Sequence, residues 1–125
     1  MTNPNQSPNE SAIDFAELLS RVDNDRELLL DLMSIFKEDF PRHVHELTEV
    51  VAAHDHKKMT VVGHTLKGML ANLAVSRAAS AAAKLEQLGR ENGGESEIAD
   101  ALHEFQREVQ GLLPEMEAYM AEVQG

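Results

Sequence analysis

The sequence predicts an all-helical protein, arranged as an antiparallel up-down-up-down four-helix bundle with a short additional N-terminal helix. Apolar residues recur at steps of three and four along nearly the whole chain, as one buried face of a helix requires. No stretch of useful length alternates apolar and polar residues, so no strand is expected. With 125 residues and a hydrophobic content of 42%, the chain is long enough for one domain with its own core.

The N-terminal end predicts a disordered lead followed by a short helix. Residues 1–10 are rich in Asn, Pro and Ser, which is typical of disorder, and residues 11–125 form the expected bundle domain. Ser11 is the predicted N-cap of the short helix, with Asp14 as its capping-box acid. The apolar residues of this helix are Ile13, Phe15, Leu18 and Leu19. The segment VDND, residues 22–25, then favours a turn and a new N-cap.

The second helix is expected to run from about Arg26 to Ala53. Its predicted core stripe comprises Leu29, Leu32, Met33, Phe36, Phe40, Val44, Leu47 and Val51. Pro41 lies inside this helix and should kink it or remove one backbone hydrogen bond, because proline has no N–H. The next break is AHDHKK, in which Asp55 is the predicted N-cap of the third helix.

Two further helices are expected after the third one. The fourth, from about Val75 to Glu91, is rich in alanine, and small residues let a neighbouring helix approach closely. The stretch ENGGES predicts a loop. The last helix is expected to begin near Ser96 and to continue through Pro114. Its apolar stripe comprises Ile98, Leu102, Phe105, Val109, Leu113, Met116 and Met120.

Composition and charge exclude several classes of function. The formal net charge is −11, with 22 acidic residues against 11 basic ones, so the surface repels nucleic acids and anionic membranes. The absence of cysteine excludes disulfides and thiolate metal sites. No apolar run approaches the roughly 20 residues of a membrane span, and the N-terminus does not resemble a secretory signal. We therefore expect a cytoplasmic protein.

The third helix presents a histidine on the side opposite to its core stripe. At about 100° per residue, the apolar side chains cluster in the direction opposite to His64. These core residues are Met59, Val62, Leu66, Met69, Leu70 and Leu73. The residues on the His64 side are Lys57, Thr60, Lys67, Gly68 and Ala71. Apart from the two lysines, the neighbours of His64 on this face are small, so the ring is accessible to another protein.

This arrangement suits an imidazole that carries a phosphoryl group. Neutral imidazole is a nucleophile near pH 7, and Lys67, one turn from His64, would stabilise the phosphoryl charge. Gly68 costs the helix about 1 kcal/mol relative to alanine, and it would clear space beside the ring. An exposed histidine beside a lysine is nevertheless common on helices without such a role. The sequence gives no reason for the second glycine, Gly63, beyond relief of packing against a neighbouring helix.

Other chemistries have little support in the sequence. The histidine pairs His43/His45 and His54/His56 are two residues apart, which places their members on different helix faces. No Glu-x-x-His or His-Glu-x-x-His motif is present, and Asp100 with His103 is the nearest approach to one. No metal site or other cofactor site is therefore predicted in this chain. The sequence also lacks the glycine-rich loops that bind ATP, so a phosphoryl group on His64 must come from elsewhere.

The stretch HTLKGMLANLA, residues 64–74, resembles the histidine motif of the histidine-containing phosphotransfer (HPt) domains of bacterial two-component phosphorelays. The resemblance extends over most of the chain, including IDFAELLSRVDND, IFKEDFPRHVHELTEVVAAHD and AAKLEQLGR. It implies that His64 is the phosphoacceptor, that Lys67 stabilises the phosphate and that Gly68 admits the partner. Ala74 departs from the usual glycine at the end of the motif.

The resemblance implies a phosphoryl carrier rather than an enzyme. His64 would accept phosphate from the aspartyl phosphate of a receiver domain, as in a hybrid sensor kinase, and pass it to the receiver of a downstream regulator. Mg²⁺ is expected on the partner receiver and no cofactor in this chain. The expected docking residues are Gly68, Ala71, Thr60 and Lys57, and we expect a monomer. Two alternatives stay open: a bundle of the same fold that acts only as an interaction module, and the phosphoacceptor segment of a larger histidine kinase.

Overall fold

The computed structural model describes residues 13–124, and this part of the chain contains six helices and no strand. They are α1 (Phe15–Arg21), α2 (Arg26–Ala52), α3 (His56–Asn72), α4 (Ser76–Arg90), α5 (Glu95–Val109) and α6 (Leu112–Gln124). The all-helical prediction is confirmed. The predicted disordered lead at residues 1–10 and the predicted cap Ser11 lie outside the described residues.

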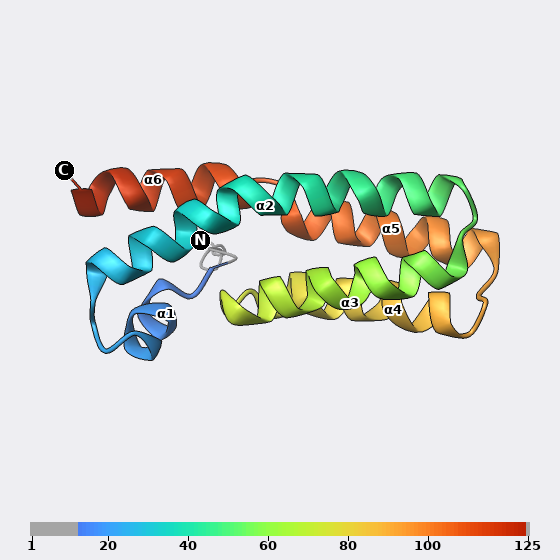
Figure 1. Cartoon of the computed structure of the whole chain (residues 1–125), viewed down its shortest axis with the longest axis horizontal. Coiled ribbons are helices and arrows are strands. Elements are labelled where there is room, and N and C mark those ends of the chain that lie inside the picture. The colour runs from blue at the N-terminus through green and yellow to red at the C-terminus, as the bar shows by residue number, and fades with distance from the viewer. Residues whose placement is uncertain (1–12, 125) are drawn as a thin grey trace, which may run out of the picture.

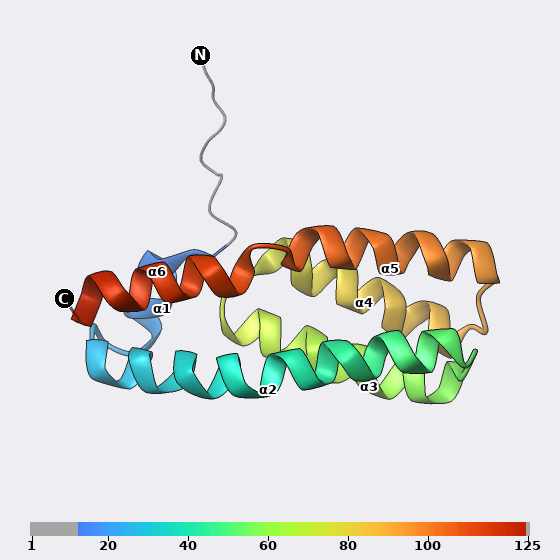
Figure 2. The same ribbon diagram turned by 90° about the horizontal axis from the view of Figure 1, so that it is seen from above.

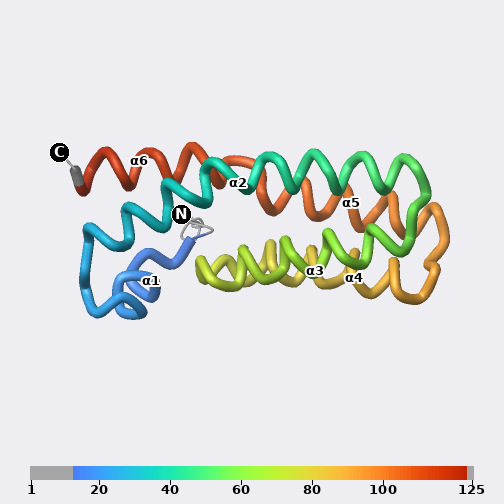
Figure 3. Tube along the Cα trace, in the orientation of Figure 1, coloured from blue at the N-terminus to red at the C-terminus, as the bar shows by residue number. Residues whose placement is uncertain are grey.

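Helices α2 to α5 lie side by side, and the chain reverses direction after each of the first three (Figure 1). Seen from above, α2 and α3 form one side of this bundle, and α4 and α5 form the other (Figure 2). Helix α6 continues beyond α5 and runs beside the N-terminal part of α2, while α1 lies near the start of α2 (Figure 3). One end of the molecule is therefore formed by α2 to α5, and the other end by α1, α6 and the N-terminal part of α2.

The core runs between the helices and contains large side chains from all six of them. Its largest fully buried members include Leu29, Met33, Leu47, Met59, Leu66, Leu70, Leu85, Phe105, Leu112 and Met116. The prediction that Leu32 belongs to the core is wrong, because its surface is 43% exposed. The N-terminal part of α2 extends past the end of α3 and packs against α1 and α6 instead (Figure 1). Leu29 and Met33 are buried there, and Leu32 lies at the edge of their side of the helix.

The turns preceding two of the helices follow the predicted capping chemistry. The carboxylates of Asp25 and Asp55 accept hydrogen bonds from the backbone N–H groups of Leu28 and Lys58, each at 3.0 Å, so both predicted N-caps are confirmed. The cap of α1 is Asp14, which accepts from the Glu17 N–H, and not the predicted Ser11.

The prediction of one continuous last helix is wrong. Helix α5 ends at Val109, Gln110 is extended with ψ of 131°, and Gly111 has φ of 82°. That left-handed conformation suits glycine, which has no Cβ to clash with the backbone. Pro114 lies in the first turn of α6, where its missing N–H has no intrahelical partner to lose. Pro41, in contrast, is accommodated inside α2, which bends near its middle (Figure 1).

Candidate functional site

His64 lies in the middle of α3 and points away from the core. Its side chain is 67% exposed, whereas Met59 and Leu66 on the opposite side of the helix are completely buried. The 3.6-residue period of the helix produces this contrast, because a core stripe on one side leaves the opposite side to solvent. One edge of the imidazole is therefore open to an approaching protein.

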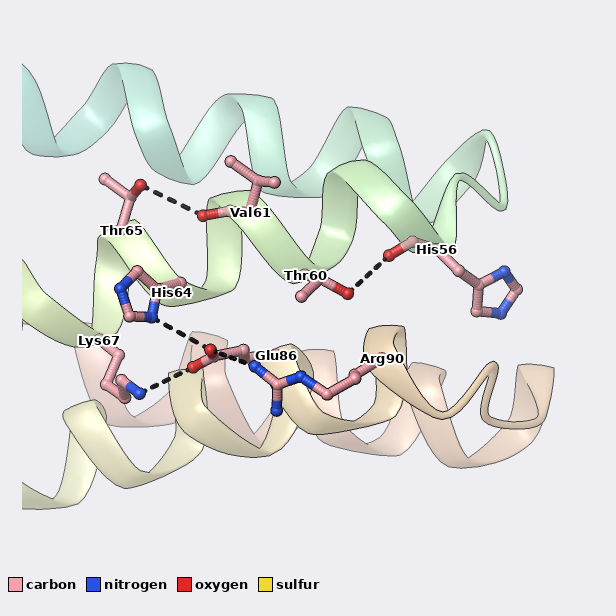
Figure 4. A network of polar contacts seen from close by, with 8 residues as sticks. All are labelled: His56, Thr60, Val61, His64, Thr65, Lys67, Glu86 and Arg90. Carbon is pink, nitrogen blue, oxygen red and sulfur yellow. Dashed lines mark hydrogen bonds and ion pairs between the residues drawn. The ribbon is translucent and has the colours of Figure 1, made fainter.

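The other edge of the imidazole meets a buried carboxylate from the neighbouring helix. Glu86, on α4, has a side chain that is only 7% exposed (Figure 4). Its Oε2 lies 3.1 Å from His64 Nδ1 and 2.7 Å from Arg90 Nη2, and its Oε1 lies 2.9 Å from Lys67 Nζ. One carboxylate thus joins the histidine to two cations that come from different helices.

These partners keep Glu86 ionised. The hydrogen bond from Lys67 is the largest of the effects that lower the pKa of Glu86 from 4.5 to about 2. Burial acts in the opposite direction, and the hydrogen bonds from Arg90 and His64 lower the pKa further. The carboxylate is therefore negative at any physiological pH, and each charge in the cluster has a partner.

The ionised carboxylate determines which nitrogen of His64 carries the proton. A carboxylate can only accept hydrogen bonds, so the contact at 3.1 Å requires a proton on Nδ1 that His64 donates to Glu86 Oε2. In the neutral ring the lone pair then lies on Nε2, at the exposed edge. The site consequently presents one nucleophilic nitrogen to solvent in a fixed orientation.

The other residues predicted for this site differ in their exposure to solvent. Gly68, Ala71 and Lys57 are exposed on α3. Thr60 is half-buried, donates to the backbone oxygen of His56 at 3.0 Å and lies against α4 (Figure 4). Lys67 is on the same face as His64, but its ammonium is already paired with Glu86.

Sequence reasoning missed Glu86 and Arg90. The signal that could have found Glu86 is its position on the alanine-rich fourth helix, four residues after the buried Ala82 and three before the buried Gly89. A charged residue in phase with small buried residues needs partners, because an unpaired buried charge is costly. Arg90 follows Glu86 at the i+4 spacing of a helix ion pair.

The remaining histidines do not form a metal centre. No group of three or more His, Cys, Asp or Glu side chains in residues 13–124 is placed to hold a metal ion. His45 and His54 each lie near one glutamate, with ring nitrogens 3.5 and 3.4 Å from Glu49 and Glu95. The ring of His56 makes a hydrogen bond of 3.2 Å with the backbone oxygen of Gly93. His64 differs from these histidines because its ring contacts the cluster of Glu86, Lys67 and Arg90.

The fold and the site together define a helical bundle with one oriented histidine whose Nε2 edge is exposed to solvent. Residues 31–124, which are 94 of the 125 residues, match the model of the Hpt domain family, and the chain belongs to this family. Hpt domains carry phosphoryl groups in phosphorelays and interact with receiver domains. Comparison with curated proteins gave no match, and comparison with solved structures gave none either. No helix within the described range is long and apolar enough to cross a membrane.

Proposed function

We propose that this protein is a phosphoryl carrier that accepts a phosphoryl group on His64 from the aspartyl phosphate of one receiver domain and passes it to another. The observation that carries the proposal is the hydrogen bond between His64 Nδ1 and the ionised Glu86. This bond leaves the lone pair on the exposed Nε2, and a nucleophilic nitrogen needs an accessible lone pair. Membership of the Hpt domain family supports the same role.

In the first transfer, the Nε2 lone pair attacks phosphorus in line with the bond to the aspartyl oxygen. The N–P bond forms, the O–P bond breaks, and the aspartate leaves as a carboxylate with the bonding electron pair. The ring gains positive charge as Nε2 gives up its lone pair, and the negative Glu86 beside Nδ1 stabilises this charge. Transfer to the second receiver reverses these steps with another aspartate as the nucleophile.

Two cations lie near His64 because both are paired with Glu86, its hydrogen-bond partner. Lys67 and Arg90 both hold Glu86, and their side chains are 38% and 61% exposed. Either cation can turn its outer N–H groups toward phosphoryl oxygens on Nε2, because long basic side chains have several rotatable bonds. We assign the main electrostatic role to Lys67, with Arg90 as a second donor that sequence reasoning did not include.

The proposed docking face contains His64 and the exposed residues around it. Gly68 and Ala71 leave a flat surface beside the ring, and Thr60 and Lys57 lie further along α3. Leu28, Leu32 and Ile35 form an exposed apolar stripe on α2, and Val61 on α3 is a further large apolar side chain that is exposed. Both helices form the same side of the bundle (Figure 2). A receiver that covers this face would remove apolar surface from water, which stabilises the complex.

The partners complete the chemistry in this proposal. The donor is the receiver of a hybrid sensor kinase, the acceptor is the receiver of a downstream regulator, and the transfers take place in the cytoplasm. The Mg²⁺ that neutralises phosphoryl charge belongs to the receiver's acidic pocket, so the bundle contributes one nucleophile and its positioning. The carrier acts as a monomer.

The decisive experiment mixes the protein with a panel of phosphorylated receivers from its source. The expected result is transfer of label to this chain, with the label lost in acid and retained in base, as a phosphohistidine behaves. Incubation with ATP alone is the control and should give no label. A protein that accepts no phosphate from any receiver in the panel would instead be an interaction module.

A further inference from the structure

We infer that Gly63 is a positioning residue: its missing side chain sets the separation between α3 and α4 at which Glu86 reaches His64. Gly63 precedes the histidine and is buried against α4. A Cβ at this position would lie 2.9 Å from the backbone nitrogen and 3.1 Å from the Cα of Glu86. Only glycine at position 63 permits this contact with Glu86. Glu86 is also the residue that forms the hydrogen bond with the imidazole of His64.

A second glycine makes the same approach from the opposite helix. Gly89, on α4, is one turn beyond Glu86, and a Cβ there would lie 2.8 Å from the backbone oxygen of His56 and 2.9 Å from the backbone nitrogen of Thr60. Both glycines thus face backbone atoms, which cannot rotate away as a side chain could. The first contact is with the backbone of Glu86 itself, and the second lies on α3 one to two turns before His64.

The distances indicate how sensitive the hydrogen bond is to this contact. Ordinary van der Waals contact with a Cβ begins at 3.4 Å, so an alanine at position 63 would displace the Glu86 backbone by about 0.5 Å. The His64–Glu86 hydrogen bond is already 3.1 Å long. If the carboxylate moves with its backbone away from α3, a further 0.5 Å takes the Nδ1–Oε2 distance beyond the range of a hydrogen bond. The methyl group absent from Gly63 therefore decides whether Nδ1 stays bonded to Glu86.

Gly68 offers a matched comparison in the same helix. A Cβ at Gly68 would meet nothing within 4 Å, so this glycine does not set any distance inside the protein. The Gly63→Ala and Gly68→Ala variants gain the same helix propensity, because each replaces a glycine inside α3 by alanine. Only Gly63→Ala should move α4.

The test measures the protonation pattern of the His64 ring by ¹⁵N NMR of histidine-labelled protein, at a pH where the ring is neutral. The parent and Gly68→Ala should show the Nδ1–H form. In Gly63→Ala and in Gly89→Ala, the ratio of Nδ1–H to Nε2–H forms should fall several-fold. In a Glu86→Ala background, Gly63→Ala should cause no further change, because the carboxylate through which it acts is gone.

The functional meaning of the inference rests on the proposed carrier function, but its geometry does not. If Gly63→Ala lowers the Nδ1–H fraction and no receiver phosphorylates the parent, the positioning role stands and the carrier function fails. Where the parent is phosphorylated, Gly63→Ala should slow transfer several-fold. A Gly63→Ala variant that folds, as judged by circular dichroism, and keeps the parent's ratio would overturn the inference. Failure of both glycine variants to fold would also overturn it, since the glycines would then serve packing alone.

Discussion

At the scale of single residues, the protonation state of Glu86 links the site to the stability of the fold. Its folded-state pKa of about 2 lies below the 4.5 of a free side chain, so the ionised form contributes stability above pH 4.5. That contribution is lost as the pH falls from 4.5 through 2, because the native state must then take up a proton. Linkage sets an upper limit of about 3 kcal/mol, which solvent around Lys67 and Arg90 reduces to about 1–2 kcal/mol.

Glu86→Gln should therefore flatten the acid side of the stability profile. We expect the free energy of unfolding of the variant to be lower than that of the parent at pH 6, with the two values converging toward pH 2. Urea unfolding at pH 6, 4 and 2.5 measures this difference, and Glu122→Gln, at an exposed carboxylate, is the control. Parallel profiles for Glu86→Gln and the parent would show that Glu86 is not held ionised by its partners.

Lys67 can be tested separately from the shape of the site. Lys67→Ala removes one ammonium and should shift the phosphorylation equilibrium several-fold toward the donor receiver, since a partly exposed contact is worth about 1 kcal/mol. Lys67→Arg should recover part of the loss. The measurement is the phosphorylated fraction against one receiver at two salt concentrations, with the exposed Lys84→Ala as control. If Lys67→Ala equals the parent at low salt, the electrostatic role is wrong.

At the scale of helices, Gly68 separates access to the site from helix stability. Because nothing lies within 4 Å of a Cβ at this position, Gly68→Gln should keep or raise the melting temperature. The larger side chain should nevertheless obstruct the receiver and slow transfer. Gly68→Ala supplies the propensity gain with little bulk and should transfer nearly as fast as the parent. Equal transfer rates in Gly68→Gln and the parent would mean that the glycine is not there for clearance.

Helix ends and core positions could be predicted where the interaction that determines them lies within a few residues of the chain. The N-caps Asp25 and Asp55 were predictable because a carboxylate before a helix bonds to that helix's own N–H groups. The break at Gly111 was missed because the apolar spacing continues across it, although Gly111 and Pro114 are residue types that suit the end of one helix and the start of the next. Leu32 was misplaced because it lies at the edge of the stripe that contains the buried Leu29 and Met33, and periodicity does not show how wide a stripe the neighbouring helices cover.

The site itself divides in the same way. His64, Lys67 and Gly68 follow one another on one helix, so spacing alone places them on one face. Glu86 comes from another helix, and its distance from His64 depends on how closely α3 and α4 pack. That separation is a property of tertiary structure. The sequence offered packing against a neighbouring helix as the reason for Gly63, and the phase of Glu86 with small buried residues was a signal for a paired charge, but neither identified Glu86 as the partner of His64.

At the scale of the whole molecule, the proposal predicts that one side of the bundle binds receivers. Ile35→Asp introduces a charge into the exposed apolar stripe of α2 and should slow transfer about tenfold or more while leaving the melting temperature within a few degrees of the parent. Gln106→Asp, at an exposed position on α5, should leave transfer unchanged. Both rates are measured against the same receiver. Similar effects of the two variants would mean that docking does not use the α2–α3 side.

The central claim, that His64 is the phosphoacceptor, is tested most directly by labelling the His64→Gln variant with a phosphorylated receiver. The control is His54→Gln, which removes another exposed histidine. We predict that His64→Gln folds as the parent does, because the exposed ring of His64 is not part of the core. The variant should take up no label, because it lacks the nucleophilic nitrogen. His54→Gln should be labelled normally. Label retained by His64→Gln, or mapped to any other histidine in the parent, would contradict the account.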